Sequence, residues 1–195
     1  MSPLLLDGSG TVAQGTSAGV GVAELTSTAT SGQYAMARGD FAALALAGAV
    51  GYWFRAELTP RSVSSAFVEA GLCDSDRTDY VRFLFDTSVD ATYWRFESRD
   101  NTTQNALTLP HAAAADTFVT LDIVFVTTIF AAGWLNGDGP YTLTANLPSA
   151  SLTPYVLSGT RTSAAKTVRL ESVRLDALNG TIINPAVDPM LRLYG

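Results

Sequence analysis

Apolar and polar residues alternate with a period of two along much of this chain. The segments that show this alternation most clearly are 52–58, 80–86, 93–97 and 118–126. A period of two places successive side chains on opposite faces of a β-strand, so each segment predicts a strand with one buried face. No segment shows a convincing amphipathic helical period. The chain is therefore predicted to be all-β.

Turn-forming residues separate the predicted strands at intervals of about 8–12 residues, which is typical of a β-sandwich or barrel. The clearest turn is Asn136-Gly137, a strong hairpin signal after the apolar segment 129–135. The segment 166–176 has a phase break, because Leu170 and Val173 fall on opposite faces in strict alternation. This break predicts a β-bulge, or a strand that passes between two environments.

The chain has 195 residues, which suffices for one hydrophobic core and is short for two domains. We predict a single domain over 1–195. Residues 1–40 are read as a Gly/Ser/Thr-rich N-terminal arm with a first strand, and 41–195 as the core. The longest apolar stretch, 41–54, is shorter than the about 20 residues of a membrane-spanning helix. It is therefore read as buried strand and loop, and no membrane partner is expected.

Net charge and cysteine content restrict the kinds of partner and the cellular compartment that suit this chain. A net charge of -6 and an isoelectric point near 4.6 argue against the phosphate backbone of nucleic acids as a partner. Cys73 is the only cysteine, so no intrachain disulfide can form, whereas small secreted domains usually carry one. The sequence thus predicts assembly in a cytoplasm. Cys73 is expected to be a small buried side chain rather than a nucleophile.

The outward-facing side chains of the predicted strands form the candidate ligand- or partner-binding face. This set is Trp53, Arg55, Glu57, Tyr80, Arg82, Tyr93 and Arg95. Exposed Trp and Tyr can stack on sugar rings or anchor a protein interface, and Arg can form paired hydrogen bonds with acidic groups. The alternative is purely structural, since opposite charges on neighbouring strands stabilise a sheet. Both interpretations remain open at this point.

Asp74, Asp76 and Asp79 follow an Asp-x-Asp-x-x-Asp pattern. Carboxylate oxygens at this spacing can hold Ca²⁺, although a solvated turn is the favoured interpretation. No other cofactor is expected.

Catalytic patterns are not evident. Glycoside hydrolases of related folds place carboxylates together on one strand face, whereas Glu57, Glu97 and Glu171 lie on separate predicted strands. Any histidine-based triad would rest on His111, the only histidine, which is expected in a loop. We therefore expect a protein without enzymatic activity.

The order of features between Tyr52 and Leu178 resembles that of a known domain type. Segment 52–58 looks like its first long strand, 93–96 like its central aromatic strand and 168–175 like its closing strand. Segment 118–123 followed by 134–137 is similar to its Asn-Gly hairpin. The series resembles concanavalin A-like jelly-roll domains of tailed-bacteriophage virion structural proteins. The resemblance implies an antiparallel two-sheet jelly-roll β-sandwich of the lectin/glucanase type.

The resemblance also implies a function: a bacteriophage virion structural protein, assembled in the host cytoplasm and displayed as a head decoration or a tail or fibre component. Its partners would be other virion proteins and its own copies, in a closed homo-oligomer. The N-terminal arm and 187–194 would be attachment segments. The alternative is a glycan-binding, lectin-like module or receptor-binding adhesin that contacts host surface glycans. A glycosidase is a third possibility, and it would require two carboxylates facing each other across a cleft.

Overall fold

The computed structural model describes residues 4–17, 20–39, 51–149 and 151–178, which form two seven-stranded antiparallel sheets. The first sheet, in spatial order, contains β1 (Leu4–Gly8), β4 (Tyr34–Gly39), β13 (Thr153–Thr160), β6 (Ala66–Cys73), β7 (Tyr80–Asp86), β8 (Asp90–Asp100) and β9 (Thr103–Ala112). The second sheet contains β12 (Asp138–Leu143), β11 (Phe130–Leu135), β10 (Val119–Val126), β5 (Gly51–Pro60), β14 (Thr167–Leu178), β3 (Val20–Thr26) and β2 (Thr11–Ser17).

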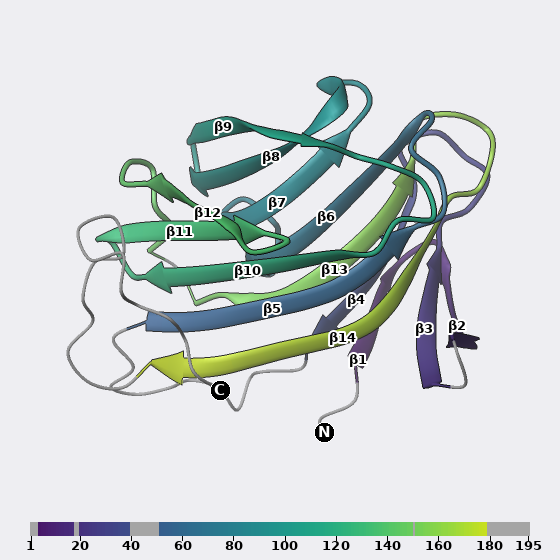
Figure 1. The fold of residues 1–195 in the computed structure, drawn as a ribbon, viewed down its shortest axis with the longest axis horizontal. Helices are drawn as coiled ribbons and strands as arrows, with labels where there is room; N and C mark the ends of the chain where they lie inside the picture. Colours follow the sequence, from purple (N-terminus) through teal and green to yellow (C-terminus); the bar gives the residue numbers. More distant parts are fainter. Residues whose placement is uncertain (1–3, 18–19, 40–50, 150, 179–195) are drawn as a thin grey trace.

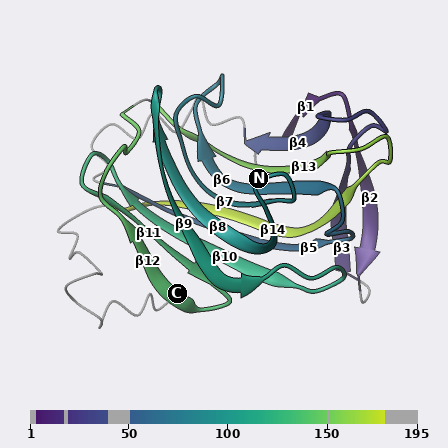
Figure 2. The ribbon, with the colours of Figure 1, turned by 90° about the horizontal axis from the view of Figure 1, so that it is seen from above.

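The two sheets pack face to face, and their strands run in similar directions (Figure 1). Seen from above, the strands are bowed rather than flat (Figure 2). The predicted antiparallel two-sheet β-sandwich is therefore confirmed. No helix in the described part of the chain is long and apolar enough to span a membrane.

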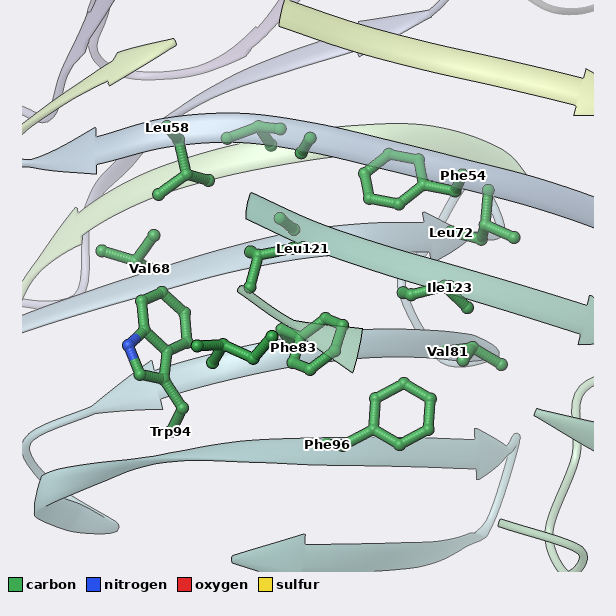
Figure 3. Close-up of a cluster of buried hydrophobic side chains, with 14 of the residues drawn as sticks. Phe54, Leu58, Val68, Leu72, Val81, Phe83, Trp94, Phe96, Leu121 and Ile123 are labelled. Carbon is green, nitrogen blue, oxygen red and sulfur yellow. The ribbon is translucent and has the colours of Figure 1, made fainter. Parts of the chain in front are cut away.

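The core lies between the sheets and is built from every second residue of their strands. Phe83 and Phe96 of the first sheet pack at a centroid distance of 4.9 Å, opposite Phe54 and Ile123 of the second (Figure 3). Full burial of such side chains stabilises the fold by about 1.5–3 kcal/mol each. Gly133 on β11 lies against these rings, because a Cβ there would sit 2.8 Å from Phe83 Cζ.

Two local predictions are confirmed. Asn136 and Gly137 both have positive φ, 53° and 81°, which the tight two-residue hairpin between β11 and β12 requires. The pairing of β14 with β5 shifts register between Leu170 and Ser172, so a β-bulge is present at the predicted phase break. Beyond it, Val173 returns to the core side and partly packs there.

Residues 4–17 and 20–39 belong to the sandwich itself. β1 and β4 extend the first sheet beside β13, and β2 and β3 extend the second beside β14. Leu25 and Ala35 of this region are fully buried in the core. The region predicted as an arm thus contributes four strands. Residues 41–50 of the predicted core and the predicted attachment segment 187–194 lie outside the described residues.

Candidate functional site on the outer face of the first sheet

The predicted binding residues do not form one face. Tyr80 and Arg82 on β7, with Tyr93 and Arg95 on β8, point outward from the first sheet. The other three, Trp53, Arg55 and Glu57 on β5, point outward from the second. The two outer faces point away from each other, so a single ligand cannot contact the whole predicted set.

The second-sheet residues are engaged with one another. Arg55 contacts Glu57 at 3.2 Å and Asp122 at 3.7 Å, and Trp53 Nε1 donates to Asp122 Oδ1 at 3.2 Å. Ser172 Oγ donates to Glu57 at 2.8 Å. Burial raises the pKa of the Asp122 carboxyl despite the nearby Arg55 charge. This face shows the cross-strand pairing of opposite charges expected to stabilise a sheet.

The first-sheet face is organised around Arg82. Its guanidinium contacts Glu69 at 2.7 Å and Glu97 at 3.0 Å, and it lies 3.9 Å above the ring centroid of Tyr80. The Tyr155 hydroxyl donates to Glu69 at 2.9 Å. Burial alone would lower the pKa of Arg82, but the charge of Glu69, with smaller contributions from Tyr155 and Glu97, raises it well above its ordinary value.

The β6–β7 loop lies across the part of this face that β4 and β6 form. Arg77 of the loop stacks 4.5 Å above the Tyr34 ring and lies 3.9 Å from Glu69. Arg38 on β4 donates to the Ser75 carbonyl at 3.3 Å. The outward side chains of this region form a buried apolar cluster that includes Met36, Cys73, Tyr155 and Leu157. This part of the face is closed to a ligand.

Another ion pair closes one end of the face. Arg161 donates from both Nε and Nη2 to the carboxylate of Asp86, with an Nε–Oδ1 distance of 2.9 Å. The same guanidinium lies 4.3 Å from the centroid of the Phe67 ring. Burial alone would raise the pKa of the Asp86 carboxyl, but the hydrogen bonds from Arg161 and Ser88 lower it.

The open part of the face lies over β8 and β9. Strand register places Thr108 beside Arg95 and Gln104 beside Arg99, and both β9 side chains are exposed. Tyr93 also points outward here and is 42% exposed. We call this set, Tyr93, Arg95, Arg99, Gln104 and Thr108, the β8–β9 surface. Between its two arginines, the small side chain of Ala106 lies beside Glu97.

Several polar groups of the β8–β9 surface have no intramolecular partner. The Nε atoms of Arg95 and Arg99 are buried without a hydrogen bond, although Arg95 Nε lies 3.2 Å from Glu97 Oε1. Within residues 4–17, 20–39, 51–149 and 151–178, Arg99 forms no ion pair, and the side chains of Gln104 and Thr108 accept or donate no hydrogen bond. Unsatisfied buried polar groups are uncommon and require a physical explanation.

The three aspartates predicted as calcium ligands lie in the β6–β7 loop. Asp74 accepts hydrogen bonds from Thr78 N at 2.8 Å, Thr78 Oγ1 at 2.9 Å and Asp79 N at 3.1 Å. Asp79 accepts one from Asn101 N at 2.5 Å, and Asp76 is exposed. The Asp74 carboxylate thus orders the β6–β7 loop, and Asp79 connects it to the turn between β8 and β9. In the described part of the chain, no three His, Cys, Asp or Glu side chains gather as metal ligands.

His111 lies on β9 rather than in the predicted loop. Its Nε2 atom is 2.7 Å from Asp138 Oδ2 and 2.9 Å from the Tyr141 hydroxyl, which itself donates to Asp138 at 2.6 Å. The cluster joins the edge strands β9 and β12, and therefore the two sheets. No sequence pattern indicated this cluster, because His111 is 27 or more residues from its partners.

No family model and no curated protein matches this chain. Solved structures do. The receptor-binding domain of botulinum neurotoxin C/D mosaic serotype superposes with a TM-score of 0.63 at 9% identity, over 91% of this chain and 44% of that one. The botulinum neurotoxin DC binding domain in complex with rat synaptotagmin II gives 0.61 at 8%, over 91% and 44%. A botulinum neurotoxin type C structure, described with cell entry dependent on two ganglioside molecules, gives 0.59 at 8%, over 91% and 44%.

These likenesses show the fold alone. The chain spans less than half the length of the neurotoxin structures it matches. The partners named for those domains therefore belong to proteins more than twice as long as the shared part. The resemblance to bacteriophage virion proteins stays a prediction, and it draws no support from these structures.

Proposed function

We propose that this domain is a non-catalytic glycan-binding module whose site is the β8–β9 surface. The observation that carries the proposal is the pair of arginines, Arg95 and Arg99, each beside an exposed polar side chain of β9. The exposed side chains of Gln104 and Thr108, which form no hydrogen bond within the described residues, can hydrogen-bond to the hydroxyls of a sugar. Tyr93 adds an exposed ring at the same surface, and aromatic rings pack well on sugar rings.

The surface is held in place from below. Glu97, which is fully buried, lies between Arg95 and Arg82, so the Arg95 guanidinium is anchored on a buried ion pair. Tyr80 packs under Arg82 and lies in register with Arg99. A site built on packed strands requires little ordering when a ligand binds, which favours affinity.

The polar character of this surface favours a glycan over protein assembly. Protein interfaces concentrate buried aromatic and apolar anchors, whereas the β8–β9 surface has one exposed aromatic ring among polar groups. The shared fold adds support, because structures with it include binding domains described with gangliosides and with a protein receptor. Glu69 and Glu97 are both engaged with Arg82 rather than facing each other across a cleft, which supports a role without catalysis.

A glycan array with matched variants tests the proposal. Tyr93→Ala and the double variant Gln104→Leu/Thr108→Val should each weaken binding by about tenfold, since two hydrogen bonds of about 0.5–1.5 kcal/mol each are removed in the double variant. Arg174→Gln, on the exposed outer face of the second sheet, should bind as the wild type does. The proposal fails if no glycan binds, or if the β8–β9 variants bind as tightly as Arg174→Gln.

A further inference from the structure

Arginines gather on one face of the described part of the chain. Of the eleven Lys and Arg residues in this part, six lie on the outer face of the first sheet or its bordering loops. These six are Arg38, Arg77, Arg82, Arg95, Arg99 and Arg161. The carboxylates there are at least as numerous: Glu69, Asp86, Asp90 and Glu97 on the strands, with Asp74, Asp76 and Asp79 in the β6–β7 loop. The face as a whole therefore carries no excess of positive charge, and an anion-binding site there depends on arginines that lack a carboxylate partner.

The charges of this face are unevenly paired. Arg161 is balanced by Asp86, and Arg82 holds both Glu69 and Glu97. Glu97 is thus shared between Arg82 and Arg95, and Arg95 also interacts electrostatically with Asp90 without forming an ion pair, so its charge is partly balanced. No described carboxylate pairs with Arg99, whose side chain is half-buried beside Gln104. The uncompensated charge that faces the open surface is at Arg95 and Arg99.

We infer that the ligand of the β8–β9 surface is an anionic glycan, with acidic groups of separate sugar units at Arg95 and Arg99; this rests on the proposed function. A guanidinium binds a carboxylate or sulfate through paired, charge-assisted hydrogen bonds. Arg95 and Arg99 are four residues apart on one strand, a separation of about 13 Å at 3.3 Å per residue. This spacing along the strand suits an oligosaccharide that carries acidic groups on separate sugar units.

Because the chain as a whole is negatively charged, binding of an anionic glycan must depend on a local site. Net negative charge repels a polyanion from the molecule as a whole, so general attraction does not explain binding. The polyanion must instead be held locally, by the arginines of the β8–β9 surface. The affinity should consequently fall as salt is added.

The experiment measures the binding of three polysaccharides: polygalacturonate, which carries carboxylates, dextran sulfate, which carries sulfate esters, and neutral dextran. Wild type, Arg99→Gln and Arg174→Gln are compared at low and high salt. Because Arg99 pairs with no described carboxylate, Arg99→Gln leaves no buried charge unpaired, and its melting temperature should match that of the wild type. Arg174 pairs with the exposed Asp176 on the second sheet and is the matched control.

Binding of an acidic polymer but not dextran, weakened about tenfold or more by Arg99→Gln and less than about twofold by Arg174→Gln, supports the inference. Whether polygalacturonate or dextran sulfate binds identifies the acidic group. Equal binding of dextran, or no effect of Arg99→Gln, overturns the anionic ligand while leaving glycan binding in place. Equal binding of a single-stranded DNA oligonucleotide overturns the glycan specificity. The lack of any bound glycan, neutral or acidic, overturns the proposed function itself.

Discussion

Replacement of Arg82 by methionine should destabilise the domain strongly. The Arg82 side chain is 14% exposed and bridges Glu69, which is 8% exposed, and Glu97, which is fully buried. Removing one partner of a buried ion pair costs about 3–5 kcal/mol. Here each carboxylate retains a second contact, Glu69 with Tyr155 and Glu97 with Arg95, so we expect a loss near the lower limit, about 3 kcal/mol.

Urea denaturation followed by tryptophan fluorescence measures this loss, together with the melting temperature, which should fall by about 6–12 °C for a chain of this length. Arg55→Met is the matched control, because Arg55 also contacts two carboxylates from the middle of a strand but is 38% exposed. Its loss should stay below about 1 kcal/mol. If both variants lose the same small amount, the buried network around Arg82 does not stabilise the fold as argued.

Three further outcomes follow from the structure. The pKa of Asp86 is lowered in the folded state, so its contribution to stability is present above about pH 4 and is lost as the pH falls through the native pKa. The stability difference between wild type and Asp86→Asn should therefore shrink on acidification, and a constant difference in urea midpoints would contradict this. Burial raises the pKa of Cys73 to about 12, so the native thiol should react with a disulfide reagent only on unfolding, and rapid labelling without urea would contradict the burial. Gly71→Ala should lower the free energy of unfolding by about 1–3 kcal/mol, because the added Cβ would lie 2.2 Å from the Val81 carbonyl oxygen between paired strands. An unchanged melting curve would show that β6 and β7 can separate freely.

Alternation in the sequence determined which side chains leave the core, but not which sheet they belong to. Arg55 and Arg82 show the same pattern, yet they lie on opposite outer faces, because strand pairing is set by contacts between residues far apart in the chain. The bulge in β14 could be predicted, since large apolar residues mark the phase break on both sides. The outward-facing Gln104 and Thr108 could not, because β9 lacks a regular alternation that would have marked it as a strand.

The strands β2 and β3 could not be predicted with their pairing, because their side chains are mostly small. Residues 11–26 contain few bulky side chains, so their periodicity is weak, yet they pair along β2, β3 and β14. The outward-facing Met36 and Tyr155 were equally unpredictable as buried residues. Their burial depends on the β6–β7 loop, whose path over β4 is fixed by contacts of Arg77 and Arg38 rather than by local sequence.

The sheet order also has a kinetic consequence. β4 joins the first sheet only through β13, and β3 joins the second only through β14. During synthesis on a ribosome, the first strands therefore have no place in either sheet until nearly the whole chain has emerged. Such non-local pairing slows folding and leaves strand edges exposed in intermediates. We expect refolding of this domain to be slow and prone to aggregation at high concentration.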